Sequence, residues 1–367
     1  MRKKVLIAIP SFSSGGGAEK ILSNILMNGN FDDYDIDIVE MFRGDKGLEN
    51  LPKGINVINY YNSYKYNKFV SLFLDQFGKY FPSFLRKYLV KKDDYDVEIY
   101  FEIMYPDMPF TKRDIKKISW IHGSIEEFGL DEYAWRKKRY REYLRNSNYI
   151  VAISQKTKKS ITDIYPEFKD KVSLIYNGYN FDNIYKLSQD SRREYINKNS
   201  ICSIGRIEKE KGSDKLLDVL LRIHSKGYKY HLYYIGTGTQ EELLKSKVLN
   251  LNLQKYVHFL GYQKNPYKYL IDMKCLVSMS EKEGFPGVIV ESLTLGVPFV
   301  FTNVGGVEEL SSNGRYGKII CNEEEAADSI IKYVENIEGI DKEETRLFIN
   351  QFDLQEQARK FKEIIEY

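Results

Sequence analysis

The chain has 367 residues, of which 43% are hydrophobic and 29% are charged, with a formal net charge of +3. This length exceeds what one hydrophobic core usually serves, so it predicts two domains, and the low net charge excludes a polycation. Three cysteines make no disulfide framework and indicate a reducing compartment. No metal-ligand spacing is present and no apolar run approaches the ~20 residues that span a bilayer, so we expect a cytoplasmic protein that needs no metal.

The amino-terminal segment is typical of a strand, a glycine-rich loop and a helix. Val5–Ile9 is a continuous apolar run, as in a buried parallel strand. The loop at 11–17 follows, and apolar residues recur at helical spacing from Ala18 to Met27. The free N–H groups of such a helix start favour an anion. The loop lacks the G-x-G-x-x-G pattern, which disfavours a dinucleotide.

Further short strands are predicted at 34–39, 97–101, 118–121 and 149–153. Asp35 and Asp37 alternate along the first of these, and we expect solvated strand residues there more than a metal-binding pair. His122 directly follows a strand, and the carboxyl ends of parallel strands form the functional edge of an open α/β sheet. A lone histidine is usually structural, but this position favours a functional role. Ser154 is a good N-cap for the helix after 149–153.

The stretch from Tyr61 to Lys92 combines aromatic and basic residues. Its apolar set is Phe69, Leu72, Phe73, Phe77, Tyr80, Phe81, Phe84, Leu85, Tyr88 and Leu89, and its cations are Lys65, Lys68, Lys79, Arg86, Lys87, Lys91 and Lys92. A basic helix with an aromatic face can lie on an anionic membrane. An amphipathic helix packed on the sheet with a solvated basic face explains the pattern equally well. A second basic run at 136–141 favours a membrane or an anionic acceptor, and no nucleic-acid-binding motif accompanies the charge.

The second half repeats the alternation of strands and helices. The polar segment 181–198 is interpreted as a linker after an Asn-Gly turn at Asn177. Strands at 200–204, 230–235 and 257–260 and a helix at 214–224 follow. Such alternation in both halves predicts an α/β protein with two doubly wound domains that face each other across a cleft.

The stretch 280–306 is predicted to form a loop, a helix and a strand. A helix is predicted from Gly287 to about Leu295, with Gly296 in the position of a C-terminal cap. Glu283 lies in the loop and Glu291 about one turn inside the helix, so both can face the helix start, where an anion is favoured. An anion cradle flanked by two carboxylates suits a charged ligand that also carries hydroxyls, such as a nucleotide sugar.

Several motifs in order resemble one known family. Glu283 and Glu291, separated by seven residues, are similar to the E-x7-E signature of the retaining glycosyltransferases of family 4, which have the GT-B fold. The other matching segments are Gly16–Lys20, Ser203–Gly212, Ile235–Gly238, Val257–Gly261, Gly296–Pro298 and Gly305–Glu308. The resemblance is strong in 200–310 and weak in 28–115. Similar bacterial proteins build surface polysaccharides on lipid carriers.

This resemblance implies a role for each matching residue. Arg206 and Lys211 would hold the donor diphosphate, Glu291 the ribose, and Glu283 the hydroxyls of the donor sugar. His122 would approach the sugar, so His122, Arg206, Lys211 and Glu283 form the implied catalytic set. The implied donor-binding set is Gly16, Gly17, Gly205, Arg206, Lys211, Gly261, Tyr262, Glu283, Gly284, Phe285, Pro286, Gly287, Val288 and Glu291. The three-glycine loop is one residue longer than the commonest form, which leaves its register open.

The resemblance also implies domains and chemistry. Residues 1–185 would form an acceptor-binding domain onto which the helix 351–367 packs back, and residues 196–350 the donor-binding domain. The implied enzyme moves a sugar from a nucleotide diphosphate sugar, with UDP as the expected carrier, and needs no metal. Its acceptor would be a glycan or a polyprenyl-diphosphate-linked glycan of a capsule or lipopolysaccharide, with no nucleic acid partner and a place at the inner face of the cell membrane.

Three alternatives remain open. A nucleotide-sugar epimerase of the same fold and a non-catalytic nucleotide-sugar or membrane-binding protein would share parts of the pattern. Paired carboxylates also serve glycoside hydrolysis. A hydrolase has no use for a diphosphate cradle, which disfavours it.

Overall fold

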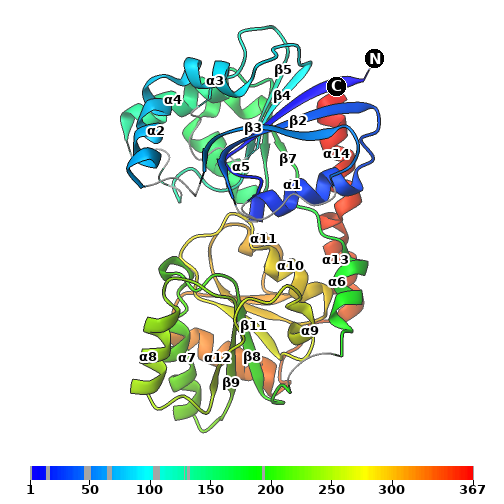
Figure 1. Cartoon of the computed structure of the whole chain (residues 1–367). Coiled ribbons are helices and arrows are strands. Elements are labelled where there is room, and N and C mark those ends of the chain that lie inside the picture. The colour runs from blue at the N-terminus through cyan, green and yellow to red at the C-terminus, as the bar shows by residue number, and fades with distance from the viewer. Residues whose placement is uncertain are drawn as a thin grey trace. The chain divides into compact units, whose positions relative to one another are not determined.

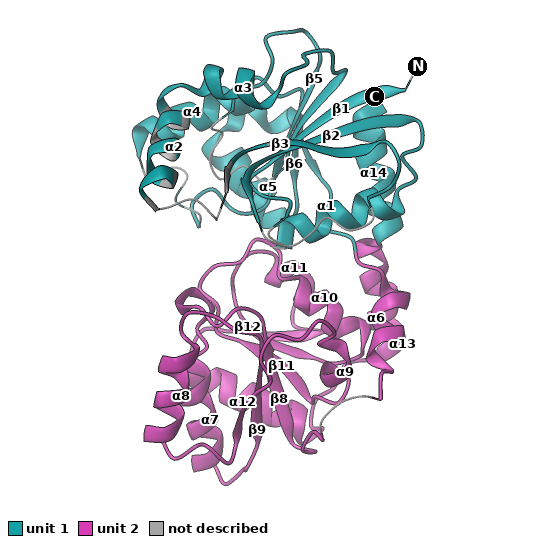
Figure 2. Cartoon of the chain, viewed as in Figure 1, with its two compact units in different colours: residues 1–178, 354–367 teal, residues 179–353 magenta. Residues whose placement is uncertain are grey.

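The structure is a computed structural model that describes residues 2–13, 17–44, 51–63, 68–101, 108–127, 129, 133–191 and 195–366. It divides into two compact units (Figures 1 and 2). Unit 1 comprises Met1–Gly178 and Leu354–Tyr367, and unit 2 comprises Tyr179–Asp353. Each unit has a parallel sheet with helices on both faces, so the predicted α/β, doubly wound fold class is confirmed.

Unit 1 is built on a sheet in the order β3-β2-β1-β4-β5-β6-β7. Its strands are β1 Lys3–Ile9, β2 Tyr34–Arg43, β3 Ile55–Ser63, β4 Val97–Phe101, β5 Lys116–Ile121, β6 Tyr149–Ala152 and β7 Val172–Leu174. Its helices are α1 Gly17–Asn28, α2 Lys68–Tyr80, α3 Pro82–Leu89, α4 Ala134–Arg145, α5 Gln155–Ile164, the 3-10 turn η1 Pro166–Lys171 and α14 Leu354–Glu366. The central strands are buried on both faces, which explains their continuous apolar runs.

Unit 2 is built on a second parallel sheet in the order β10-β9-β8-β11-β12-β13. Its strands are β8 Ser200–Ile204, β9 His231–Ile235, β10 Val257–Phe259, β11 Cys275–Ser278, β12 Phe299–Thr302 and β13 Gly317–Ile320. Its helices are α6 Phe181–Ser188, α7 Lys215–Ser225, α8 Glu241–Asn250, α9 Tyr267–Leu270, α10 Gly287–Thr294, α11 Val307–Ser311, α12 Glu323–Val334 and α13 Lys342–Ile349, with 3-10 turns η2 Lys209–Lys211 and η3 Asn350–Phe352. Neither β3 nor β13 was predicted from the sequence.

The chain passes between the units twice, and both passages differ from the expected boundaries. Unit 2 begins at Tyr179, so 181–188, interpreted above as linker, form α6 within it. Unit 2 ends at Asp353, and α14 belongs to unit 1. There the aromatic ring of Phe361 on α14 lies 5.5 Å from Trp120 and 5.9 Å from Phe31, centroid to centroid.

The predicted N-cap of α5 is confirmed. Ser154 caps α5, its Oγ accepting a hydrogen bond from the backbone N–H of Thr157 at 3.0 Å. Asp35 and Asp37 have protein partners: Arg2 lies 3.3 Å from the first, and the Tyr95 hydroxyl donates to the second at 2.8 Å. These contacts explain both carboxylates as structural residues.

The aromatic and basic stretch is not one helix. It begins in β3 and continues as α2 and α3, which are separated at Phe81 because Pro82 starts a new helix. On α3, Leu85 and Leu89 are buried. Between them Arg86 reaches the fully buried Glu98 of β4, at 2.5 Å between Nη2 and Oε1. The expectation that Arg86 belongs to a solvated basic face is therefore wrong.

The Glu98 carboxylate has a further donor, the backbone N–H of Thr111 at 2.9 Å. Arg86 also forms a second ion pair, with Asp93 at 2.8 Å. Burying a carboxylate is tolerated only with such a charged and hydrogen-bonded environment. This network fixes α3 to the sheet. No helix in the described residues is long and apolar enough to cross a membrane.

The Arg86–Glu98 pair predicts a large stability effect. Arg86→Met leaves the Glu98 carboxylate buried without its cation, so we expect the free energy of unfolding to fall by about 3–5 kcal/mol in urea denaturation. The matched control is Lys159→Met, which removes an exposed pair with Asp163 on α5 and should change stability by less than about 1 kcal/mol. Equal effects of the two variants would contradict the structural role of the buried pair.

Candidate functional site

Two loops of unit 2 meet at the carboxyl edge of its sheet. One follows β8 and runs from Gly205 to Gly212, and the other follows β11 and runs from Met279 to Pro286. The backbone N–H of Glu281 donates to the carbonyl of Glu210 at 2.8 Å. Gly212 has a φ of +60°, and a Cβ built there would lie 2.2 Å from the carbonyl oxygen of Met279. Only glycine allows this approach, which joins the two loops.

The joined loops bring two predicted residues into contact. Lys211 Nζ lies 2.7 Å from Glu283 Oε1, and about a fifth of each side chain is exposed. Arg206 stands apart from this pair, because its side chain is 70% exposed and its contact with Glu210 is 3.5 Å long. A cation and a carboxylate thus form a partly buried pair, and a second cation on the same loop is accessible.

Glu291 lies in the second turn of α10, as expected. The hydroxyl of Tyr267, a buried residue of α9, donates to its Oε1 at 2.8 Å. Burial and the Glu291 charge raise the pKa of Tyr267 and of the buried Tyr179 above the ordinary value. Sequence reasoning missed both tyrosines, which lie far from Glu291 along the chain and belong to no recognisable motif.

The start of α10 faces the same edge. Pro286 precedes the helix and, among the described residues, no side chain caps it. The hydroxyl of Tyr179 would lie 2.4 Å from a Cβ at Gly287, so the helix start packs closely on this ring. Phe285 is buried, with its ring 5.5 Å from that of Phe352. Within the predicted set Gly284–Val288, the Phe285 side chain therefore serves packing.

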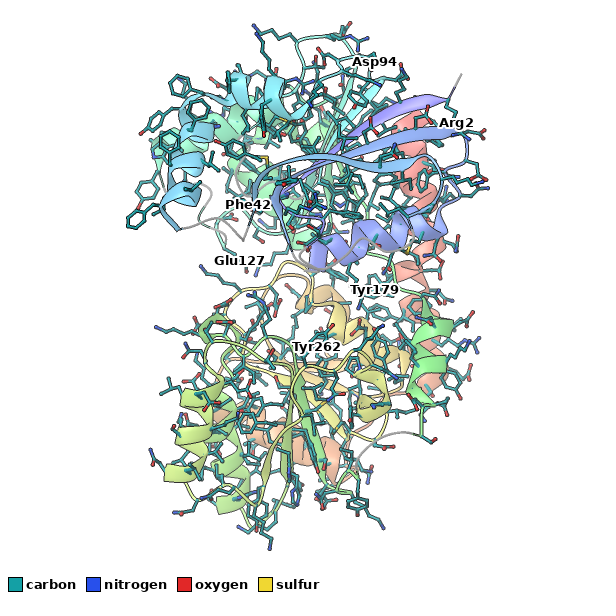
Figure 3. The ribbon with its side chains drawn as sticks, viewed as in Figure 1. Arg2, Phe42, Asp94, Glu127, Tyr179 and Tyr262 are labelled. Atoms are coloured by element: carbon teal, nitrogen blue, oxygen red, sulfur yellow. The ribbon has the colours of Figure 1, made fainter. Side chains whose placement is uncertain are left out.

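Gly261 and Tyr262 follow β10 at the same edge. The carbonyl of Gly261 accepts a hydrogen bond from the N–H of Gly236 at 2.8 Å, and Gly205 N–H donates to Ile235 at 3.1 Å. Tyr262 is 69% exposed and projects from the loop (Figure 3). The loops after β8, β9 and β10 are thus connected by backbone hydrogen bonds.

Three predicted residues, His122, Gly16 and Gly17, belong to unit 1. His122 follows β5 directly. Its Nε2 is buried and has no hydrogen-bond partner within the described part of the chain, and burial lowers the pKa of the imidazole to about 3. The ring is therefore neutral near pH 7, so it can exchange a hydrogen bond but carries no charge. Gly17 opens α1, and Gly16 lies outside the described residues.

Glu40 in β2 is a residue that sequence reasoning missed. It is 1% exposed, and its Oε2 accepts hydrogen bonds from the backbone N–H groups of Phe12 and Ser13 at 3.0 and 3.1 Å. The hydroxyl of Ser13 donates to the same oxygen at 2.7 Å. Glu40 therefore holds the segment after β1. An available signal was the charge that interrupts the apolar run Ile38-Val-Glu-Met-Phe42.

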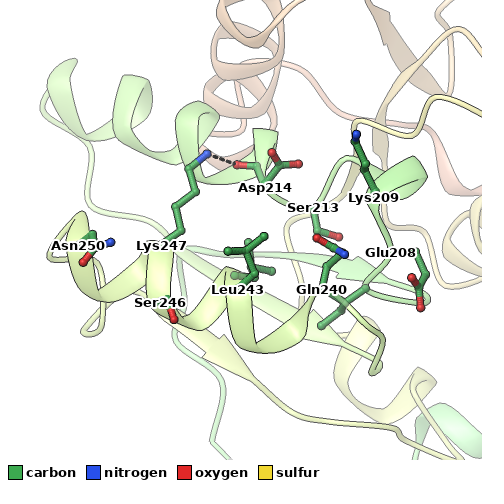
Figure 4. A pocket seen from close by; sticks show the side chains of 11 residues that line it. Glu208, Lys209, Ser213, Asp214, Gln240, Leu243, Ser246, Lys247 and Asn250 are labelled. Carbon is green, nitrogen blue, oxygen red and sulfur yellow. Dashed lines mark hydrogen bonds between the residues drawn. The ribbon is translucent and has the colours of Figure 1, made fainter.

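A pocket of about 430 Å³ lies elsewhere in unit 2, between η2, the start of α7 and α8 (Figure 4). Its lining includes Glu208, Lys209 and Leu243. Lys247 and Asp214 also line it, and Lys247 Nζ donates to the carbonyl oxygen of Asp214 at 3.1 Å. None of the predicted site residues lines this pocket. In the described ranges, no group of three or more His, Cys, Asp and Glu side chains is arranged to hold a metal ion.

Two family models match this chain. The model "Glycosyltransferase Family 4" matches residues 16–183, and the model "Glycosyl transferases group 1" matches residues 186–366. Together they extend over nearly the whole sequence.

Two curated relatives align with part of the chain. It is 29% identical over 180 residues to the capsular polysaccharide biosynthesis glycosyltransferase CapM of Staphylococcus aureus, with 47% of each chain covered. It is 28% identical over 169 residues to an N-acetylgalactosamine-N,N'-diacetylbacillosaminyl-diphospho-undecaprenol 4-alpha-N-acetylgalactosaminyltransferase of Campylobacter jejuni, with 45% of each covered. The chain spans about half the length of these relatives.

The fold is similar to that of solved structures over the full length. The crystal structure of Anabaena HepE in complex with UDP superimposes with a TM-score of 0.71, covering 98% of both chains at 17% sequence identity. This likeness shows the GT-B fold.

The loop contacts predict that Gly305 is more sensitive than Gly261. Both have positive φ, +51° and +64°, but a Cβ at Gly305 would lie 2.4 Å from the Glu283 carbonyl oxygen, whereas a Cβ at Gly261 meets no atom within 4 Å. Gly261→Ala should cost about 1–2 kcal/mol of unfolding free energy from backbone strain alone. Gly305→Ala should cost clearly more, because the loop that carries Glu283 must shift. Equal losses in parallel denaturation curves would refute the close contact.

Proposed function

The chain belongs to the family 4 glycosyltransferases, and we propose that it transfers a sugar from a nucleotide diphosphate sugar to a glycan or lipid-linked acceptor. The observation that carries the proposal is the Lys211–Glu283 pair beside the start of α10. A cation and a helix N-terminus attract the donor diphosphate, and a carboxylate accepts hydrogen bonds from sugar hydroxyls. The exposed Arg206 provides a second cation on the same loop.

Donor binding would exchange partners within this pair. The diphosphate takes over the ammonium group of Lys211, and Glu283 then becomes free to accept from the sugar. Glu291, oriented by the Tyr267 hydroxyl, accepts hydrogen bonds from the ribose. The two charges that pair in the structure would thus both be used for the ligand, Lys211 for the diphosphate and Glu283 for the sugar hydroxyls.

The reaction we propose retains the anomeric configuration. The bond between the anomeric carbon and the diphosphate oxygen breaks, and the acceptor oxygen forms its bond on the same face of the sugar. The acceptor proton passes to the departing phosphate oxygen. Arg206 and Lys211 stabilise the negative charge that develops on the diphosphate, which makes their effect greatest in the transition state. Because these cations and the α10 dipole neutralise the leaving group, we propose that no metal is needed.

The choice of substrates rests on the relatives. The name of the Campylobacter enzyme specifies a diphospho-undecaprenol acceptor, CapM is assigned to capsular polysaccharide, and HepE was crystallised with UDP. These names support a UDP-sugar as donor and a polyprenyl-diphosphate-linked glycan as acceptor. His122, Gly16 and Gly17 remain predicted residues for the sugar and acceptor side. We further propose that the enzyme works in the cytoplasm at the inner face of the membrane.

The proposal is tested with a panel of nucleotide sugars. We expect one UDP-sugar to raise the melting temperature and to be consumed with a polyprenyl-diphosphate glycan, giving a product whose anomeric configuration by NMR is that of the donor. Activity should persist in a chelator. Interconversion of two UDP-sugars without an acceptor would instead establish an epimerase, and stabilisation without any turnover would indicate a binding protein. Loss of activity in the chelator would refute metal independence.

The role of Lys211 has a matched control in Lys215, the first residue of α7. Lys215 pairs with Glu281 at 2.8 Å, so both lysines contact the loop after β11. Lys211→Ala should lower kcat/KM by roughly 10²–10³-fold, because a charge that stabilises the leaving group is lost. Lys215→Ala should leave it nearly unchanged. The Lys215–Glu281 pair is 38% and 53% exposed, so Lys215→Ala should lose less than about 1 kcal/mol of stability. Lys211→Ala should lose more, because it leaves a carboxylate that is only 19% exposed without its cation, so rates are compared at a temperature where both variants are folded. Similar rates for the two variants would exclude the assigned role.

A further inference from the structure

Helices α2 and α3 present a continuous aromatic surface to solvent. Phe77 connects the two helices, with its ring centroid 6.3 Å from Phe73 on α2 and 5.5 Å from Phe84 on α3. Around it lie six aromatic residues that are more than half exposed: Phe69 80%, Phe73 69%, Tyr80 69%, Phe84 57%, Phe81 56% and Tyr88 53%. Figure 3 shows aromatic rings projecting from this part of unit 1. Scattered exposed apolar residues are ordinary, but a contiguous set marks an interaction site.

This surface is not the core-facing side of the helices. The side of α3 that faces the core consists of Leu85 and Leu89, which are 0% and 1% exposed, with Arg86 paired to Glu98 between them. The helix therefore cannot rotate to bury its rings without breaking a buried ion pair. Helix α3 therefore packs on the sheet and still directs its aromatic residues outward, and the membrane interpretation of this stretch stays a prediction.

Exposed lysines border the surface, namely Lys87, Lys91 and Lys92. Of the acidic residues that follow them, Asp93 pairs with Arg86, and Asp94 pairs with Lys4 and also attracts Lys92. Three lysines at the edge of an aromatic patch favour an anionic partner over a second copy of the same surface, whose lysines would repel them.

Helix α4 also carries exposed aromatic and basic residues. Its buried Tyr140 and Tyr143 belong to the hydrophobic cluster that also contains Leu85 and Leu89, so α3 and α4 pack into one core. On α4, Trp135 is 44% exposed, and Lys137 and Lys138 are exposed. Aromatic and basic residues therefore recur on a neighbouring helix of unit 1.

We propose that this aromatic–basic surface of α2 and α3 docks unit 1 on an anionic lipid bilayer. Aromatic rings partition to the boundary between headgroups and acyl chains, and lysines bind the acidic headgroups. Each lysine near an anionic membrane strengthens binding by roughly fivefold, so three contribute about 100-fold. The docking does not depend on the proposed activity. It would hold the protein where a lipid-linked acceptor is found.

The test is co-sedimentation of the full chain with vesicles. Vesicles of phosphatidylcholine with phosphatidylglycerol should bind the protein, and vesicles of phosphatidylcholine alone should bind it far less. The triple variant Lys87→Gln, Lys91→Gln, Lys92→Gln should weaken binding by roughly 100-fold. Arg86 is left intact, because its substitution would disturb the fold. The matched control, Lys198→Gln, Lys229→Gln, Lys255→Gln, removes three exposed charges from unit 2 and should bind as the parent does.

A second pair of variants tests the rings. Phe69→Ser, Phe73→Ser, Phe84→Ser should release the protein from the vesicles with an unchanged melting temperature. The control Leu243→Ser, Leu249→Ser, Leu347→Ser removes three comparably exposed apolar residues, 68%, 58% and 73%, from unit 2 and should keep binding. Absence of vesicle binding by the parent protein, or equal loss in control and test variants, overturns the proposal. A dimer that only the Phe variants abolish, without vesicle binding, would assign the surface to self-association instead.

Discussion

Backbone contact between two loops of unit 2 is the constraint on which the candidate donor site depends. Parallel strands place all their carboxyl ends at one edge, so the loops after β8 and β11 must meet there. Gly212 lets the loop after β8 approach the loop after β11, and Gly305 lets the loop after β12 approach it too, each within a distance that a Cβ would prevent. The position of Glu283 relative to Lys211 is therefore decided by main-chain packing, and the side chains only complete the pair.

The carboxylates of the two units have different kinds of partner. In unit 2 the carboxylates of the site have partners that a ligand can replace or share, namely Lys211 for Glu283 and Tyr267 for Glu291. In unit 1 the buried carboxylates Glu40 and Glu98 are held by backbone N–H groups and by Arg86. The Lys211–Glu283 pair, with about a fifth of each side chain exposed, costs less to separate than the Arg86–Glu98 pair, whose carboxylate is fully buried. This difference fits exchangeable contacts for binding and permanent ones for the scaffold.

Helix α3 shows how one short segment can serve the core and a surface. Its leucines and Arg86 face the sheet, and its aromatic residues face outward. The composition of 61–92 identified an unusual segment but left its orientation open, since both interpretations use the same amphipathic spacing. Glu98 fixed the orientation of α3, because a fully buried carboxylate on β4 required a cation from this helix.

The sequence by itself determined the doubly wound α/β class, most strand positions and the loop–helix unit that carries Glu283 and Glu291, because apolar periodicity, glycines and caps are local signals. It did not determine β3, β13, the exact passages at 178/179 and 353/354, or the partners Tyr267, Tyr179 and Glu40. These were decided by tertiary structure, since each depends on residues far apart in the chain that only the parallel sheets bring together. The sequence shows which residues can carry charge, and tertiary packing determines which of them come into contact.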